Sequence, residues 1–355
     1  MKPLIQKQIE TALKDACESF VFSGYQVATC SPLAQNVLCG GKISYWGAPI
    51  EVSEETYFDL GSLTKVLLTT SVFARLVDQK KLDVLSTLED HIQSFKGTAY
   101  AAISLKQLLT HSSGLIGWYP FYRENTKNLI SVFLKNEKIF FSSEGPGTTI
   151  YSDLGFLLLG EVLRQSFGEL NDLFQREVKE PLNLEGVTFG PLPSDQCAAT
   201  EYCLERNKLI QGEVFDHNTD FLGGICSHAG LFSSAKSLFP WAQEWLNAVQ
   251  GNSHWISQSV ARQFIGAGQG NSSSSWAMGW DTKSKAFSSA GDIVSSETFG
   301  HLGFPGTSVW IDPKKSGVIV LLTNRVHPSR LDERIKRFRP LIHNLIAESW
   351  ENHGS

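Results

Sequence analysis

Hydrophobic positions near the N-terminus recur at helical spacing and are followed by two strand-like runs. The helical positions are Ile5, Ile9, Leu13, Ala16 and Phe20, with charged residues between them. This spacing predicts an amphipathic helix, because a signal peptide has an unbroken apolar core instead. Apolar runs at 25–30 and 36–44, the second interrupted by Gly40-Gly41, predict two strands of a hairpin or meander.

The middle of the chain has helical character, and strand character returns near the end. Apolar positions predict a buried helix over 62–79, after a short apolar approach at 56–60. Further helices are predicted at 103–109, 154–167 and 170–178. Strands are then predicted at 275–281, 295–301, 306–311 and 318–323, with a turn at 312–317. An amphipathic helix over 331–345 closes the chain.

This order predicts an α/β (α+β) fold in which both chain ends contribute to one antiparallel sheet flanked by the terminal helices. The expected sheet lobe comprises residues 1–80 and 276–355, and residues 81–275 form a mainly helical lobe. Clefts between lobes are favoured ligand sites, so we expect the active site between them.

Composition narrows the function classes. The 355 residues are 42% hydrophobic and 19% charged, with a net charge of -5, which argues against a nucleic-acid partner. The basic residues near the C-terminus are interpreted as the solvated face of a helix: Arg330, Arg334, Lys336, Arg337 and Arg339. The sequence has no run of 18 apolar residues, so we expect no membrane partner. Its six cysteines form no CxxC pair and no zinc-ligand spacing, so we expect no metal or cofactor and a cytoplasmic chain with reduced cysteines.

Ser62-Leu63-Thr64-Lys65 is the first candidate for catalytic chemistry. A serine hydroxyl needs a base to become a good nucleophile, and positions three apart on a helix share a face. Lys65 can therefore reach the Ser62 oxygen, and burial would lower its pKa. Ser233-Ser234-Ala235-Lys236 has the same spacing. Gly61 and a strongly apolar helix flank the first pair, whereas the second is interpreted as an ordinary helix cap.

Five segments in order resemble the serine β-lactamase and penicillin-binding protein superfamily, in particular its class C-type members. They are FDLGSLTK at 58–65, LLTHSSGL at 108–115, GPGTTIYSDLGFLLLGEVL at 145–163, AGLFSSAKSL at 229–238 and HLGFPGTSVWIDP at 301–313. The S-x-x-K motif of that family lies in the first segment. The third segment resembles a Tyr-x-Asn motif, and the fifth resembles a Lys-Thr-Gly or His-Thr-Gly motif.

The resemblance implies a role for each motif residue. Ser62 would be the acylated nucleophile, Lys65 its activating partner, and Tyr151 a second base that passes a proton to the leaving group. The backbone N–H groups of Ser62 and Phe304 would form an oxyanion hole. His301 would orient substrate or Tyr151. Gly303 and Asp153 complete the predicted oxyanion and substrate-binding group.

Three motif positions depart from the family pattern. Asp153 stands where asparagine is usual, and its charge would raise the pKa of Lys65 and oppose its use as a base. His301 replaces the lysine of typical β-lactamases, and a neutral histidine attracts a carboxylate less. Leu302 lacks the usual threonine hydroxyl. These changes weaken the expectation of β-lactam hydrolysis and leave ester or amide hydrolysis open.

Several other polar groups are interpreted as structural or peripheral. Two other triplets contain the residue types of these family motifs but are expected elsewhere in the fold. Tyr57-Phe58-Asp59 lies on the short approach strand before Ser62, and Lys315-Ser316-Gly317 lies in a turn. His228-Ala229-Gly230 is interpreted as loop, and His111 as a structural hydrogen-bonding residue. The segment 216–218 is expected near the cleft.

The predicted function is a serine hydrolase that acts through an acyl-enzyme on a small ester or amide. A D-amino-acid peptide, for example from a cell-wall fragment, fits the family best. One alternative is a non-catalytic member that binds a ligand or partner, suggested by Asp153 and Leu302. A second is an interaction protein that uses the basic C-terminal helix.

Overall fold

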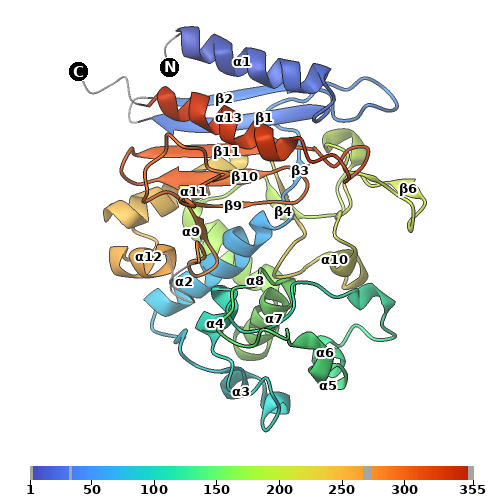
Figure 1. Cartoon of the computed structure of the whole chain (residues 1–355), viewed down its shortest axis with the longest axis vertical. Helices are drawn as coiled ribbons and strands as arrows, with labels where there is room; N and C mark the ends of the chain where they lie inside the picture. Colours follow the sequence, from blue (N-terminus) through green and yellow to red (C-terminus); the bar gives the residue numbers. More distant parts are fainter. Residues whose placement is uncertain (1–2, 32–33, 267–273, 351–355) are drawn as a thin grey trace.

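A six-stranded antiparallel sheet occupies the upper half of the computed structural model, which describes residues 3–31, 34–266 and 274–350 (Figure 1). Its strands run in the order β2-β1-β11-β10-β9-β8. Their bounds are β1 Gly24–Ser31, β2 Ala34–Gly41, β8 Asp281–Thr282, β9 Phe299–Leu302, β10 Ser308–Asp312 and β11 Gly317–Thr323. Tyr25 lies opposite Thr323 and Cys30 opposite Val318. The predicted fold class, with both chain ends in one sheet, is confirmed.

Helices cover both faces of this sheet. α1 (Pro3–Glu18) and α13 (Ile335–Glu348) pack against one face, and α11 (Ala235–Gln250) packs against the other. Strand β11 is therefore buried along its whole length, which explains its unbroken run of valine, isoleucine and leucine. The predicted terminal helices are confirmed, although α13 begins later than expected and leaves Leu331 exposed.

The chain between β2 and β8 contributes most of the helices, which fill the lower half of Figure 1. They are α2 Ser71–Asp78, α3 Leu88–His91, α4 Leu105–Leu109, α5 Leu129–Lys135, α6 Glu137–Phe140, α7 Asp153–Phe167, α8 Leu170–Phe174, α9 Glu180–Leu182, α10 His217–Phe221 and α12 Gln258–Ile265. Two smaller sheets complete the fold. One has three strands in the order β3 (Phe58–Asp59), β7 (Leu231–Ser233) and β4 (Val187–Phe189), and the other pairs β5 (Tyr202–Cys203) with β6 (Lys208–Leu209). The lobe boundaries at 80 and 275 stay a prediction.

Some predicted elements differ from the structure. The strand predicted at 295–301 begins only at Phe299, and the helix predicted at 170–178 continues after Phe174 as a π-helix, η4 (Gln175–Lys179). The expected helix over 62–79 starts with a π-helix, η1 (Lys65–Thr70), before α2 begins, and π-helical turns are frequent at functional sites. The strand predicted at 275–281 is wrong except at its last residue. Gly279 has a positive φ, and the Ala277 N–H donates to the Trp280 carbonyl, so this segment turns back. Its apolar residues bury Trp280 in the core instead of pairing in a sheet.

Candidate active site

A tight turn after β3 positions Ser62 at the entrance to η1. The buried Asp59 accepts hydrogen bonds from the Gly61 N–H at 2.8 Å and the Phe215 N–H at 2.7 Å. Gly61 has a φ of +51°, and a Cβ there would lie 2.4 Å from Pro305 Cδ, so only glycine fits this turn. The Tyr57-Phe58-Asp59 triplet therefore has the structural role expected of it.

Lys65 is completely buried, with its amine against Ser62. Lys65 Nζ donates to Ser62 Oγ at 3.0 Å and to the His228 carbonyl at 3.3 Å. The Asp153 carboxylate lies 2.6 Å from the same nitrogen. Three of the residues predicted for the site are thus brought together around one buried amine.

The Asp153 carboxylate decides the protonation state of Lys65. Burial by itself lowers the pKa of Lys65, but the charge of Asp153, with a contribution from Tyr151, outweighs burial and raises the pKa above its usual value. The shift has the direction expected from aspartate in place of asparagine. Lys65 is therefore an ammonium at neutral pH, and it donates to the Ser62 oxygen instead of accepting the Ser62 proton.

Tyr151 lies beside this amine, immediately before α7. Its ring centroid is 5.0 Å from Lys65 Nζ, and the ring packs between His111 and Trp276, with centroids 4.7 Å and 5.2 Å away. The residue is 37% exposed, so substrate can reach it. Burial raises its pKa, Lys65 opposes that rise, and Asp153 adds to it, so the net direction is upward.

His301 lies on β9, with its ring centroid 6.0 Å from that of Tyr151. Its Nδ1–H donates to the Leu302 carbonyl at 2.8 Å, which leaves Nε2 as an acceptor. This buried Nε2 has no hydrogen-bond partner among the described residues. Burial and the Lys65 charge lower the pKa of His301 to about 3. A neutral ring offers an acceptor to the site but no charge for a substrate carboxylate.

The predicted oxyanion groups meet where the turn at Gly61 touches the loop after β9. A Cβ on Gly61 would lie 3.3 Å from the Phe304 nitrogen, so the two backbone segments are adjacent. The N–H groups of Ser62 and Phe304 donate to no other group in the described part of the chain. Gly303 approaches so closely that a Cβ would lie 2.3 Å from the Leu60 carbonyl oxygen. Ser62 and Phe304 thus carry N–H groups without a partner in the described part of the chain on adjacent backbone segments, and an oxyanion hole requires a donor pair of this kind.

Two arginines hold this loop. Arg339 is buried and donates to the carbonyls of Gly303 and Thr307, each at 3.0 Å. Arg325 donates to the Phe304 carbonyl at 2.9 Å, and its guanidinium lies 4.3 Å from the Phe304 ring centroid. The interpretation of Arg339 as part of a solvated basic face is wrong, because its side chain points under the loop. No local pattern marks it, since its partners lie more than 30 residues away.

Two buried histidines form hydrogen bonds with the segments that carry the site residues. His111 Nδ1 accepts the Ser152 N–H at 3.0 Å, so its structural role is confirmed, although it holds the Tyr151 segment. His228, expected only as part of a loop, supplies a carbonyl to Lys65 and pairs through its ring with Asp216 at 3.1 Å. Burial lowers the pKa of His228, but Asp216 overcomes this and raises it to about 10.

The rival motifs have ordinary structural roles. Ser234 caps α11 by accepting the Ser237 N–H at 3.1 Å, and Lys236 pairs at the surface with Glu55. Lys315-Ser316-Gly317 lies in the turn between β10 and β11. The interpretation of both as structural segments is confirmed.

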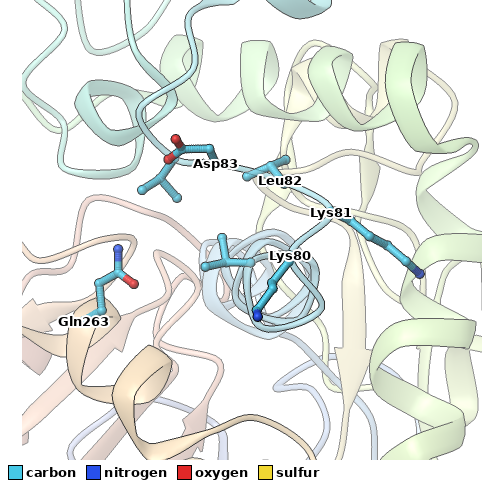
Figure 2. Close-up of a pocket in the computed structure, with 7 residues that line it drawn as sticks. Lys80, Lys81, Leu82, Asp83 and Gln263 are labelled. Atoms are coloured by element: carbon cyan, nitrogen blue, oxygen red, sulfur yellow. The ribbon is translucent and has the colours of Figure 1, made fainter.

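One cavity lies at the C-terminal end of α2. This cavity has a volume of about 370 Å³ and is lined mainly by the residues that come after α2 in the chain, with Gln263 on another side (Figure 2). It contains none of the residues predicted for the site.

Among the helices of the described residues, none is long and apolar enough to cross a membrane.

Comparison with known proteins identifies similar sequences and folds. Residues 37–343 match the family model described as Beta-lactamase. The chain is 30% identical over 317 residues to an N-acetylmuramyl-L-alanine amidase of Bacillus subtilis (strain 168), covering 80% of this chain and 71% of the relative. It is 26% identical over 311 residues to a putative D-alanyl-D-alanine carboxypeptidase of Salmonella typhi, covering 79% and 72%.

Solved structures share the fold at low identity. A class C beta lactamase from Rhodobacter sphaeroides superposes with a TM-score of 0.73 at 17% identity, covering 96% of this chain and 99% of that one. EstCE1, a hydrolase with promiscuous acyltransferase activity, gives a TM-score of 0.75 at 19% identity, covering 97% and 98%.

Proposed function

The chain belongs to the beta-lactamase family of hydrolases, and on this basis we propose that it is a serine hydrolase acting through an acyl-enzyme on Ser62. The observation that carries the proposal is the 3.0 Å contact between Lys65 Nζ and Ser62 Oγ beside Tyr151. The arrangement groups a nucleophile, a fixed positive charge and a second titratable oxygen around one buried amine.

In the proposed acylation, Tyr151 accepts the proton and Lys65 supplies charge. Ser62 Oγ attacks the substrate carbonyl while its proton passes to Tyr151, because the Lys65 ammonium has no lone pair to accept it. Tyr151 acts in its phenolate form, which is a minor species at neutral pH because its pKa is raised, so activity is expected to rise towards alkaline pH. The Lys65 charge stabilises both the phenolate and the developing serine anion. The two backbone N–H groups stabilise the tetrahedral oxyanion, and losing one such donor typically costs about 3 kcal/mol in the transition state.

Collapse of the intermediate breaks the bond to the leaving group, which takes the proton from Tyr151. Water then attacks the Ser62 ester and gives its proton to Tyr151, and Ser62 recovers its proton as the acid product leaves. Tyr151 passes the proton it received from water back to Ser62, so over the full cycle both residues regain their starting protonation states and water is the only reagent consumed. His301 Nε2 is a buried acceptor with no hydrogen-bond partner among the described residues.

The proposed substrate is a small amide or ester, with a D-amino-acid peptide from a cell-wall fragment as the best fit. The names of the two sequence relatives support cell-wall peptide chemistry. The neutral His301 and the apolar Leu302 disfavour recognition of the β-lactam carboxylate, so any β-lactamase activity is expected to be weak. Six free cysteines in the structure support a cytoplasmic location.

One second candidate has a specific observation in its favour. The 2.6 Å Asp153–Lys65 pair removes lysine as a base, which also suits a non-catalytic member that binds a ligand without turnover. Turnover of an acyl donor separates the two candidates.

The test is hydrolysis of nitrocefin, p-nitrophenyl esters and D-alanyl peptides by the wild type and by Ser62→Ala. Ser233→Ala, in the second S-x-x-K copy, is the matched control. We expect turnover by the wild type and the control, and none by Ser62→Ala. Activity that survives Ser62→Ala rejects the mechanism, and a folded wild type inactive on every acyl donor favours the binding protein.

A further inference from the structure

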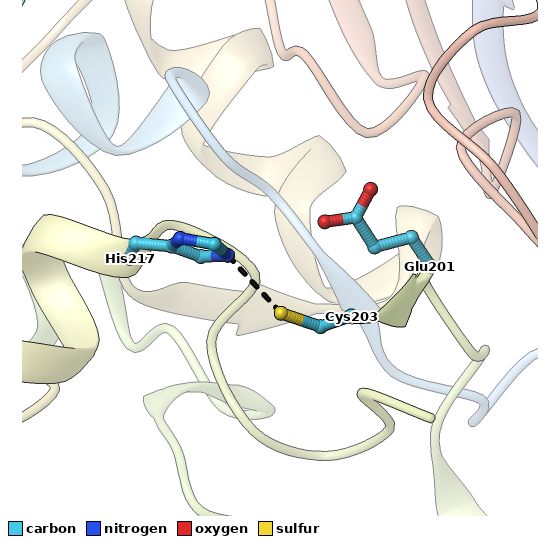
Figure 3. Close-up of side chains that lie close together, drawn as sticks. All are labelled: Glu201, Cys203 and His217. Carbon is cyan, nitrogen blue, oxygen red and sulfur yellow. Dashed lines mark hydrogen bonds between the residues drawn. The ribbon is translucent and has the colours of Figure 1, made fainter. Parts of the chain in front are cut away.

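Strand β5 and helix α10 bring three metal-binding side chains together outside the candidate active site. Side chains alternate along an extended chain, so Glu201, immediately before β5, and Cys203 point to the same side. Both are buried, whereas Tyr202 between them is exposed. His217 begins α10. One donor atom from each of Glu201, Cys203 and His217 lies within 4.8 Å of the other two, and Figure 3 shows the sulfur facing the His217 ring beside Glu201.

The His217 ring is oriented as in a metal site. Its Nδ1 lies 2.9 Å from the Glu205 carboxylate, so a neutral ring places its proton on Nδ1 and its lone pair on Nε2. Metal-binding histidines commonly donate their second ring N–H to a carboxylate in this way. The Nε2 atom lies 3.3 Å from Cys203 Sγ. Zinc bonds of about 2.3 Å to sulfur and about 2.0 Å to nitrogen hold these two atoms about 3.5 Å apart in a tetrahedron, so the observed separation needs little change.

The other two donors are also held in place. The Arg206 backbone N–H donates to Cys203 Sγ at 3.4 Å, and such a donor stabilises a thiolate. Glu201 accepts two hydrogen bonds from the Arg330 guanidinium, one on each oxygen. Each carboxylate oxygen has two lone pairs, so the contact with Arg330 fixes the direction of the carboxylate and leaves a lone pair for a metal ion.

We propose that Glu201, Cys203 and His217 bind one Zn²⁺ ion. Zinc accepts thiolate, imidazole and carboxylate ligands together, whereas Mg²⁺ and Ca²⁺ select oxygen ligands and Cu⁺ selects sulfur. The three residues line a cavity of about 410 Å³, from which a water molecule supplies the fourth ligand. Binding exchanges the thiol proton of Cys203 for the ion, so one proton is released for each Zn²⁺ bound.

This proposal replaces the expectation of no metal, which rested on the spacing of cysteines and histidines along the chain. Cys203 and His217 are 14 positions apart, and Glu201 resembles any acidic residue in the sequence, so no zinc motif marks the group. The site is independent of the proposed reaction at Ser62, and its tests measure metal binding instead of turnover.

The first test is calorimetric titration of the EDTA-dialysed protein with Zn²⁺ in two buffers of different ionisation enthalpy. We expect one ion per chain with a Kd below about 1 µM and one proton released. Cys203→Ser and His217→Gln should each weaken binding by on the order of 100-fold or more. The matched controls are Cys30→Ser, in which a different buried cysteine is replaced, and His254→Gln, at an exposed histidine. Both controls should bind as the wild type does.

The second test uses a residue that would not touch the ion. Glu205→Gln removes the charge that orients His217 and should weaken Zn²⁺ binding about tenfold, whereas Glu213→Gln, at a surface carboxylate paired with Lys208, should not. Zn²⁺ in about 100-fold excess over its Kd should also raise the melting temperature of the wild type by about 3 °C, and not that of Cys203→Ser.

Circular dichroism shows whether each variant folds. If Cys203→Ser does not fold, His217→Gln and Glu205→Gln decide the question. A wild type that binds no Zn²⁺, or Zn²⁺ binding unchanged in the folded cluster variants, overturns the inference. Equally tight binding of Mg²⁺ in place of Zn²⁺ also overturns it, because a thiolate–imidazole site discriminates against Mg²⁺.

Discussion

Replacing Asp153 by asparagine should move the pH profile of the enzyme to lower pH. The carboxylate raises the pKa of Lys65 and adds to the raised pKa of Tyr151. Asparagine keeps the size and removes the charge, so both pKa values fall. The rise of activity with pH depends on forming the Tyr151 phenolate, and the fall at higher pH depends on losing the Lys65 ammonium. Both limbs of the pH profile therefore move to lower pH.

The structure gives the scale of this change. Opposite unit charges 2.6 Å apart interact by about 6 kcal/mol at an effective dielectric constant of about 20. Desolvation and the remaining amide dipole offset part of this energy. Removing a charge in direct contact typically moves a titration by about 1–3 pH units, and we expect both limbs of the profile to move by that amount.

The assay is kcat/KM for a p-nitrophenyl ester from about pH 6 to about pH 12, corrected for spontaneous hydrolysis and measured for three proteins beside the wild type, because both raised pKa values lie above about 10. Asp153→Asn should show the displaced profile, and Asp153→Glu, which keeps the charge, should move it much less. Glu297→Gln removes an exposed carboxylate before β9 and should leave the profile unchanged. A profile in Asp153→Asn that stays in place or moves to higher pH refutes the reasoning.

Three further predictions concern the residues around the site. Asp216→Asn should lower the free energy of unfolding, measured by urea titration, most strongly below about pH 6.5, and the difference from the wild type should shrink towards pH 10. The reason is that the Asp216 charge raises the pKa of His228 to about 10, and this stabilises the fold only while the His228 ring is protonated. A difference that does not change with pH contradicts this prediction. Arg339→Met should lower thermal stability by about 1–3 kcal/mol, since two buried carbonyls lose their donor, and it should also lower kcat; an unchanged kcat would show that the loop holds without Arg339. Ser234→Ala should cost about 1 kcal/mol in urea unfolding through loss of the α11 cap with kcat/KM retained, and a loss of activity would contradict a purely structural role for Ser234.

Periodicity predicts the parts of the fold that depend on local sequence. The strands β1 and β11 and the helix α7 lie within one residue of their predicted bounds at each end, because their apolar runs or helical spacing match their burial. The segment 275–281 misleads because its apolar residues fill the core from a turn at Gly279. An apolar run does not distinguish a paired strand from a buried turn.

The motifs predict which residues meet, and tertiary contacts explain the rest of the site. Ser62, Lys65, Tyr151 and Asp153 come from two segments that each carry a recognisable motif. Arg339 cannot be found in this way, because it donates hydrogen bonds to the backbone carbonyls of residues more than 30 positions away. Every residue type has a backbone carbonyl, so the sequence does not show which carbonyls need a side-chain donor.

His228 escapes sequence reasoning for a related cause. Its contact to Lys65 is made by the backbone, and its ring partner, Asp216, caps α10. The polar segment at 216–218 gives the only signal, and the structure connects that segment to Lys65 through His228.

Covalent labelling tests the central claim most directly. A fluorophosphonate reacts with an activated serine and remains attached, so intact-protein and peptide mass spectrometry identify the modified residue. We predict one added probe per chain, located on Ser62, in the wild type and in Ser233→Ala, and none in Ser62→Ala. A probe on another serine, or an unmodified Ser62 in folded protein, would contradict the assignment of Ser62 as the nucleophile.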